Sequence, residues 1–247
     1  MTLLYILLAT LSITFCVFVA VGFLYIKKEI LPKILLTLVS LSAGALMGGA
    51  FLHLLPESVS SGVGFDTAGL IVLLSFIFFL LVEKFLHWHH CHKANCDIHG
   101  SIGRINLLGD SIHNFIDGLV IAASFLVDFN TGIATSLAIA LHEIPQEIGD
   151  FGVLLYAGYN RKRALIFNYL VATTVVLGGL AGYFFNFMIE GVMPYLLPFA
   201  AGGFIYIAAS DLIPEVRKET SVSKFMLHLS VFVIGIIFMF LIKFIHE

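Results

Sequence analysis

The chain has 247 residues, of which 60% are hydrophobic and only 12% are charged. Because about a quarter of the residues in a soluble domain are charged, this composition excludes an ordinary soluble protein and indicates a membrane protein. The formal net charge of −3 says little, since the positions of the charges matter more than their sum. Three cysteines are too few for a disulfide framework. The expected partner is the lipid bilayer, and no nucleic-acid partner is expected.

Apolar runs separated by short polar breaks predict eight membrane spans, because a helix needs about 20 residues to cross a bilayer. We place them at residues 3–26, 34–55, 67–87, 104–127, 131–157, 164–187, 194–213 and 225–245. The first run has no basic segment before it and is too long for a signal-peptide core, so it is assigned as the first membrane helix. The predicted fold class is an all-α polytopic membrane protein, with residues 1–247 forming one transmembrane domain.

The basic residues predict the orientation of these spans. Twelve of the thirteen Lys and Arg residues follow spans one, three, five and seven, namely Lys27, Lys28, Lys33, Lys84, Lys93, Arg104, Arg161, Lys162, Arg163, Arg217, Lys218 and Lys224. The loops after spans two, four and six contain none. The positive-inside rule therefore makes the basic side cytoplasmic and both termini extracytoplasmic. We expect an integral protein of the plasma membrane.

The one long polar break, residues 88–103, is rich in histidine and is expected to be a cytoplasmic loop. Its residues His89, His90 and His92 are candidates for holding metal that emerges on this side. The alternative is a solvated linker with incidental histidines.

Spans two and seven end in similar motifs. The first is His53-Leu54-Leu55-Pro56-Glu57, and the second is Asp211-Leu212-Ile213-Pro214-Glu215. Small residues precede both motifs and allow close helix packing. Three-span units in opposite orientations are typical of inverted-repeat transporters. The motifs therefore predict a 3+2+3 arrangement, in which spans 1–3 and 6–8 are the repeats around a hairpin of spans four and five.

The two spans of that hairpin contain polar stripes. The fourth span contains Asp110, His113, Asn114 and Asp117, and the fifth contains His142, Glu143, Gln146, Glu147 and Asp150. At 3.6 residues per turn, each set lies on one side of its helix. The short connection near residues 128–131 requires an antiparallel hairpin, which brings the stripes together. Ionisable residues are costly inside a membrane, so these positions are functional candidates.

Imidazole nitrogens and carboxylate oxygens together suit Zn²⁺, Fe²⁺ or Mn²⁺, whereas all-oxygen sites suit Mg²⁺ and Ca²⁺. Pro145 cannot donate to the carbonyl of Leu141, so we expect that oxygen to be free and the helix to bend there. The predicted metal ligands are His113, Asn114, Asp117, His142, Glu143, Gln146 and Glu147. The alternative is that these residues only join helices through hydrogen bonds, but two facing stripes favour a metal site.

Further polar residues are candidates for a metal pathway. We expect His53 and Glu57 at the outer side and Asp211 and Glu215 at the cytoplasmic side, with Asp110 and Asp150 near the central site. The alternative is that each Pro-Glu pair only ends its helix at the water interface.

The two central motifs, together with FLHLLPES in span two and SDLIPE in span seven, resemble the ZIP family of metal transporters. The similarity extends over essentially the whole chain and is greatest to the branch with HNFxDG and HEIPHEIGD. It implies uptake of Zn²⁺ or a similar ion toward the cytoplasm. By position, it also implies six transport-site ligands: His113, Asn114, Asp117, His142, Glu143 and Gln146.

Two departures from the family pattern are present. Gln146 stands where that branch usually has His, which removes a nitrogen ligand and bears on ion selectivity. Span six has no acidic residue before Glu190, although binuclear relatives have a Glu in this span for a second metal. A second metal bridged to the first is therefore not expected.

These observations predict a transporter that moves Zn²⁺, or alternatively Fe²⁺, Mn²⁺ or Cd²⁺, by alternating access, with no prosthetic group. The small-residue faces are compatible with a homodimer. A metal exporter or proton antiporter is one alternative. A metal sensor is another, and an intramembrane metallohydrolase is a third. The hydrolase is disfavoured because zincins need His-Glu-x-x-His, whereas position 146 is Gln.

Overall fold

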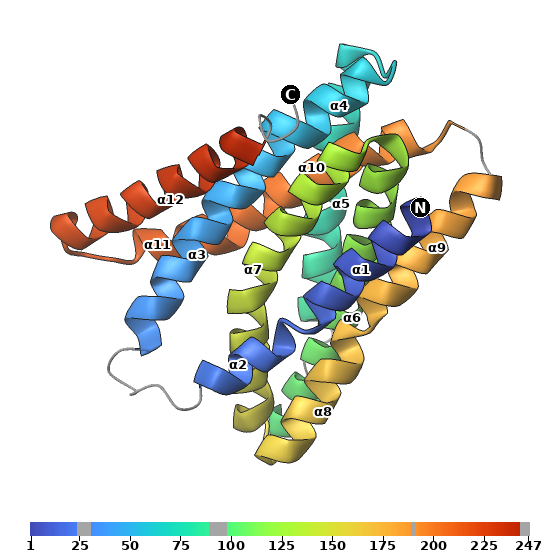
Figure 1. Cartoon of the computed structure of the whole chain (residues 1–247). Coiled ribbons are helices and arrows are strands. Elements are labelled where there is room, and N and C mark those ends of the chain that lie inside the picture. The colour runs from blue at the N-terminus through green and yellow to red at the C-terminus, as the bar shows by residue number, and fades with distance from the viewer. Residues whose placement is uncertain (24–30, 89–97, 189–190, 243–247) are drawn as a thin grey trace.

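The computed structural model describes residues 1–23, 31–88, 98–188 and 191–242, and these residues form helices joined by short turns (Figure 1). In chain order the elements are α1 (Thr2–Thr14), α2 (Val17–Phe23), α3 (Leu31–Gly48), the π-helix η1 (Gly49–Leu54), α4 (Leu55–Ser60), α5 (Phe65–Trp88), α6 (Ile98–Val127), α7 (Phe129–Tyr156), α8 (Arg161–Ala172), α9 (Thr174–Met188), α10 (Met193–Ile207), the π-helix η2 (Ala208–Leu212), α11 (Ile213–Arg217) and α12 (Val222–Ile242). The expected all-helical fold is confirmed for these residues.

Seven segments of the described chain are long and apolar enough to cross a bilayer. They are Thr2–Val19, Ile34–Ser60, Phe65–Lys84, Asn106–Val127, Arg161–Asn186, Met193–Arg217 and Val222–Ile242. The predicted fifth span corresponds to α7, which has 28 residues. Its length suffices, but Glu143, Glu147 and Asp150 make its composition less apolar than that of the other seven.

Two of the predicted spans are interrupted. The first consists of α1 and α2 with a turn at residues 15–16, and the sixth consists of α8 and α9 with a break at Thr173. In α1, the hydroxyl of Thr14 donates to the carbonyl of Thr10 at 3.0 Å. Such back-bonding bends helices. The same hydroxyl lies 3.4 Å from the carbonyl oxygen of Ala172, so the two interruptions face each other.

Both Pro-Glu motifs form a π-helix followed by a short α-helix. His53 lies in η1 and Asp211 lies in η2, and in each case a proline occupies the first turn of the helix that follows. Proline has no N–H for the usual backbone hydrogen bond, which explains why the regular pattern changes at these two places.

The helices α6 and α7 occupy the centre of the molecule (Figure 1). α3 and α12 pack together on one side, whereas α1 and α9 pack against α6 on the other. Glycines permit the closest approaches. A Cβ on Gly118 of α6 would lie 2.0 Å from the carbonyl oxygen of Val175, and one on Gly44 of α3 would lie 2.0 Å from that of Phe232. The small-residue faces are thus used within the chain.

The helix α6 begins at Ile98, six residues before the predicted start at 104. The last part of the predicted loop 88–103 is therefore helical. His89, His90 and His92 lie outside the described residues.

Candidate metal centre

The hairpin of α6 and α7 is closed by Asp128, the N-cap residue of α7. A side-chain oxygen of Asp128 accepts a hydrogen bond from the backbone N–H of Thr131 at 2.7 Å. This cap satisfies one of the free donors at the helix start and allows the chain to reverse within one residue of the end of α6. The two polar stripes consequently face each other, as the short connection predicted.

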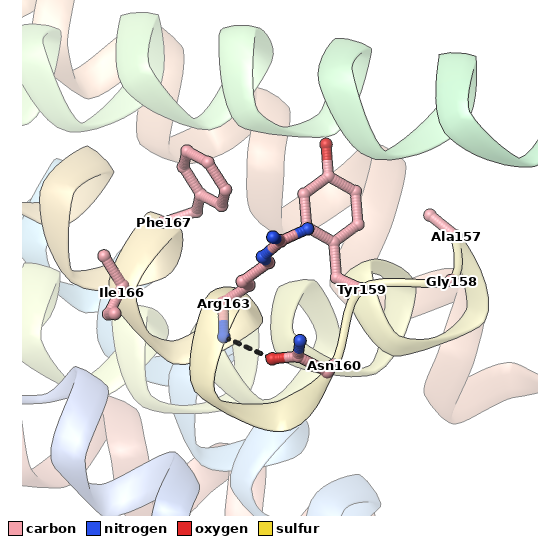
Figure 2. A pocket seen from close by; sticks show the side chains of 7 residues that line it. All are labelled: Ala157, Gly158, Tyr159, Asn160, Arg163, Ile166 and Phe167. Atoms are coloured by element: carbon pink, nitrogen blue, oxygen red, sulfur yellow. Dashed lines mark hydrogen bonds between the residues drawn. The ribbon is translucent and has the colours of Figure 1, made fainter.

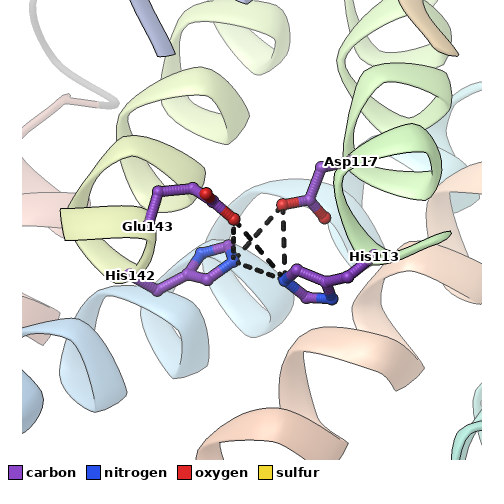
Figure 3. A group of neighbouring side chains, drawn as sticks. All are labelled: His113, Asp117, His142 and Glu143. Carbon is purple, nitrogen blue, oxygen red and sulfur yellow. Dashed lines mark hydrogen bonds and ion pairs between the residues drawn. The ribbon is translucent and has the colours of Figure 1, made fainter. Parts of the chain in front are cut away.

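Four side chains converge between the two helices (Figure 3). His113 and Asp117 come from α6, and His142 and Glu143 come from α7, and one potential ligand atom of each lies within 4.8 Å of the other three. We call these four residues the cage. The Nε2 atoms of the two histidines are 3.2 Å apart. The Oδ2 atom of Asp117 lies 3.3 Å from Nε2 of His142, and Oε1 of Glu143 lies 3.6 Å from the same nitrogen.

These separations match the ligand spacing around a small divalent ion. Zn–N and Zn–O bonds of about 2.0–2.1 Å in a tetrahedron place neighbouring ligand atoms about 3.3–3.4 Å apart. Two further pairs are similar, because Nε2 of His113 lies 3.7 Å from Asp117 Oδ2 and 3.6 Å from Glu143 Oε1. The sixth pair, between the ligand oxygens of Asp117 and Glu143, lies within 4.8 Å. One cation therefore fits between the four atoms with small adjustments.

A hydrogen bond outside the cage orients the ring of His142. Nδ1 of His142 lies 3.2 Å from the carbonyl oxygen of Ala138, which can only accept, so Nδ1 holds the proton and Nε2 keeps its lone pair. Asp117 Oδ2 and Glu143 Oε1 are buried without a hydrogen-bond partner. Buried carboxylate oxygens are costly when unpaired, and a bound cation would compensate them.

The carbonyl of Leu141 is not free, contrary to expectation. The hydroxyl of Ser42 in α3 donates to it at 2.6 Å. Pro145 has no N–H to donate to this oxygen, as predicted, but Ser42 of the neighbouring helix α3 donates to it instead. α7 continues without a break from Phe129 to Tyr156.

The amides of Asn114 and Gln146 are directed at Asp110 of α6. Their side-chain nitrogens donate to Asp110 Oδ1 at 2.9 and 3.0 Å respectively. Gln146 is thus held beside the cage by a bond between the two helices. The Oδ1 atom of Asn114 is buried without a hydrogen-bond partner.

Glu147 and Asp150 are each held by an asparagine that the sequence analysis missed. Asn168 of α8 donates to a carboxylate oxygen of Glu147, and Asn106 of α6 donates to Asp150 Oδ1 at 3.0 Å. Both asparagines lie in predicted membrane spans. The presence of a polar amide inside an apolar span was the one feature of the sequence that could have indicated their role.

The predicted outer residues lie on η1 and α4. His53 is buried, and its Nε2 lies 2.8 Å from the carbonyl oxygen of Met239 in α12. Because that oxygen only accepts, Nε2 is the donor in this hydrogen bond. Glu57 is half-buried and accepts a hydrogen bond from the hydroxyl of Ser61 at 3.1 Å.

The two residues predicted at the cytoplasmic side, Asp211 and Glu215, lie in different environments. Glu215 is exposed and paired with Lys218 at the surface. Asp211 instead lines a cavity of about 140 Å³ that His113 also lines. Glu83 of α5, which accepts a hydrogen bond from Tyr206, lines the same cavity and was not predicted as a site residue.

A larger cavity of about 570 Å³ lies at the turn between α7 and α8 (Figure 2). Tyr159, Arg163 and Phe167 are among its lining residues, and none of the residues that line it belongs to the cage. It is therefore separate from the cage.

The fold and the cage together define an integral membrane protein with a buried group of potential metal ligands on its two central helices. The chain belongs to the ZIP family, because the family model described as "ZIP Zinc transporter" matches residues 3–102 and 89–243. It is thus a member of a transporter family and not an intramembrane metallohydrolase.

Three relatives illustrate the similarity. The zinc transporter ZIP13 of Pongo abelii is 36% identical over 222 residues, which cover 83% of this chain and 65% of the relative. A ZIP13 homolog of Drosophila melanogaster is 32% identical, covering 84% of this chain and 77% of the relative. The zinc transporter YKE4 of Saccharomyces cerevisiae is 30% identical, covering 74% and 62%. The chain thus spans just under two thirds of the length of the orangutan protein.

Proposed function

We propose that this protein transports a divalent transition metal, Zn²⁺ foremost, with the cage as its central binding site. The observation that supports this most directly is the cage geometry, in which two imidazole nitrogens and two carboxylate oxygens lie within 4.8 Å of one another. Two of these atoms are buried without any hydrogen-bond partner. The similarity to proteins named zinc transporters supports the same substrate.

The proposed architecture has eight spans, with α7 as the span that contains half of the cage. Because α7 is covered by α1, α2, α3 and α6, its acidic residues face protein and not lipid. Helix pairing supports the inverted repeat. α3 packs on α12 and α5 packs on α10, so span two pairs with span eight and span three pairs with span seven. In the proposed repeat, span two corresponds to span seven and span three corresponds to span eight. The pair of spans two and eight is therefore the counterpart of the pair of spans seven and three, as an inverted repeat requires.

The proposed route begins at His53 and Glu57 and continues through the cage. From there the ion would enter the cavity that His113 shares with Asp211 and Glu83. On each side of the cage, a carboxylate would offer an oxygen ligand to an ion that has regained only part of its hydration shell. We assign the basic side of the molecule to the cytoplasm, which makes the direction uptake, and alternating access the means of opening each side in turn.

Metal flux into proteoliposomes tests this proposal. We expect the wild type to take up Zn²⁺, whereas His142→Ala and Asp117→Ala should reduce uptake to the background of empty liposomes, because each removes a cage ligand. Asp66→Ala, which changes an exposed acidic residue at the start of α5, should leave uptake unchanged. Wild-type flux in both cage variants would exclude the cage as the central site. Loading Zn²⁺ on the opposite side of oriented vesicles separates uptake from export.

A further inference from the structure

The turn between α7 and α8 is held in shape by a cap on each helix. Gly158, which follows α7, has a φ of +90°, and its N–H donates to a carbonyl in the last turn of α7 at 3.1 Å. The N–H of Tyr159 donates to another carbonyl of that helix at 3.0 Å, which completes a Schellman motif. The side chain of Asn160 then caps α8 by accepting a hydrogen bond from the N–H of Arg163 at 2.9 Å. The two caps fix the backbone from which Tyr159 and Arg163 project.

The cavity of about 570 Å³ at this turn combines a basic side chain with aromatic and aliphatic ones (Figure 2). Tyr159 and Phe167 line it with their rings edge to face, at a centroid separation of 5.6 Å. A Cβ on Gly103 of α6 would lie 2.9 Å from the ring of Tyr159, so this ring packs directly on α6. Arg163 lines the same cavity. Its volume is in the range of sites for organic ligands, roughly 300–1,000 Å³.

The positive charge at this turn is not balanced within the described part of the chain. Arg163 ends the only run of three consecutive basic residues in the sequence, Arg161-Lys162-Arg163, and all three are exposed. The sequence contains no Asp or Glu between residues 151 and 189. Among the described residues, none of the three basic side chains forms an ion pair. An anion from outside the chain would therefore complement this charge.

A second cavity on the basic side of the molecule differs in this respect. It has a volume of about 270 Å³, and Arg217 is its one charged lining residue among apolar ones. The neighbouring Lys218 is paired with Glu215, and Lys224 is paired with Glu219. Two of the three positive charges there are thus neutralised by the chain itself. The excess of positive charge is larger at the turn between α7 and α8.

The cavity of the turn lies at the polar end of a membrane-spanning segment, Arg161–Asn186. Arg163, Phe167 and Leu170 are spaced by four and three residues, so they lie on one side of α8. Phe167 is 39% exposed and Leu170 is 54% exposed. A cationic group at the interface is thus followed by exposed apolar side chains toward the bilayer interior. A phospholipid has the matching sequence of phosphate and acyl chain, whereas a soluble anion would use only the basic part.

We propose that the turn between α7 and α8 binds an anionic phospholipid of the cytoplasmic leaflet. The lipid phosphate would accept hydrogen bonds from the guanidinium of Arg163, while Arg161 and Lys162 add electrostatic attraction. An acyl chain would lie along Phe167 and Leu170. The choice of leaflet rests on the proposed orientation of the protein, whereas the binding of the lipid does not depend on metal transport.

Native mass spectrometry of the detergent-solubilised full chain tests this site with two lipids that have the same acyl chains, phosphatidylglycerol and phosphatidylcholine. We expect the wild type to bind the anionic lipid in preference. Arg163→Ala should weaken phosphatidylglycerol binding about fivefold, the effect of one basic residue at a membrane surface. Arg163→Lys, which keeps the charge, should retain the preference. Equal binding of both lipids by the wild type would overturn the proposal, as would unchanged binding in Arg163→Ala.

Two comparisons distinguish a lipid site from general attraction by charge. Arg217→Ala is the matched control, because it removes the same charge at the second cavity, and it should leave phosphatidylglycerol binding unchanged. Equal weakening in Arg163→Ala and Arg217→Ala would contradict a site at the turn. Glycerol phosphate, which has no acyl chains, should not displace the lipid at equal concentration, and full displacement would show a site for free phosphate instead.

Zn²⁺ uptake by the same wild-type preparation separates this proposal from the transport function. A protein that takes up Zn²⁺ but binds both lipids equally would remove the lipid site and leave transport standing. A protein that prefers the anionic lipid but takes up no Zn²⁺ would support the lipid site and contradict the transport function. Phe167→Ala, which removes part of the apolar wall, should weaken phosphatidylglycerol binding without any change in charge, and an unchanged affinity would contradict the proposed place of the acyl chain.

Discussion

Ser42 illustrates how a single hydroxyl stabilises the site helix. It donates to the carbonyl of Leu141, which lies beside His142 and lost its helical partner to Pro145. The sequence predicted the lost hydrogen bond but not the replacement, because a partner 99 residues away depends on how α3 packs. The bond joins α3 to the cage and holds the backbone where His142 begins.

We expect Ser42→Ala to lower the free energy of unfolding by about 1 kcal/mol, because it leaves the Leu141 carbonyl buried and unpaired. Ser40→Ala is the matched control, since Ser40 lies on the same helix and its hydroxyl donates, among the described residues, to the carbonyl of Leu36 in that helix. SDS titration of both variants measures the difference. Equal stability would show that the bond between the helices adds nothing.

Gln146 is expected to control ion preference. Its amide is bonded to Asp110 and is not among the four converging residues of the cage. Gln146→His would place a third imidazole beside the cage, and nitrogen ligands favour Zn²⁺ over Mn²⁺. We expect the ratio of Zn²⁺ to Mn²⁺ uptake in proteoliposomes to rise. Gln146→Ala is the control, because it removes the hydrogen bond to Asp110 without adding a ligand. A ratio that rises in Gln146→His but not in Gln146→Ala would result from the added imidazole nitrogen and not from the loss of the amide.

At the scale of elements, glycine pairs set the distance between helices. A Cβ on Gly178 of α9 would lie 2.0 Å from the carbonyl oxygen of Phe115, two residues from the cage residue Asp117. The contact between α6 and α9 therefore requires glycine, and it positions the face of α6 opposite α7. The sequence indicated close packing but not which helices approach each other.

We expect Gly178→Ala to destabilise the protein by about 1–3 kcal/mol, because the added methyl group overpacks the contact between α6 and α9. Gly69→Ala is the control, since nothing lies within 4 Å of its added Cβ. Alanine is the better helix former, so Gly69→Ala should be neutral or slightly stabilising. Unfolding in detergent compares the two, and an unaffected Gly178→Ala protein would show that α9 moves away at no cost.

For the whole molecule, the charge pattern predicts that the turn between α4 and α5 faces outward and the turn between α11 and α12 faces the cytoplasm. Ser61 and Thr220 are exposed residues in these turns. In a variant with all three cysteines replaced, Ser61→Cys should react with a membrane-impermeant maleimide on intact cells. Thr220→Cys should react only after permeabilisation. The opposite labelling pattern would reverse the proposed direction of transport.

The sequence by itself determined the helical class, the membrane setting, the hairpin of α6 and α7, and a set of seven candidate ligands that includes the four cage residues, because all of these follow from local periodicity and the cost of charge in lipid. Only the tertiary structure decided which polar atoms pair. It assigned Gln146 and Asn114 to Asp110, added Asn106, Asn168 and Glu83, and placed Asp211 on the same cavity as His113. Hydrogen bonds between helices depend on their rotation and distance, which small-residue contacts set across long separations in the chain. Sequence periodicity shows the face of a helix but not the partner that it meets.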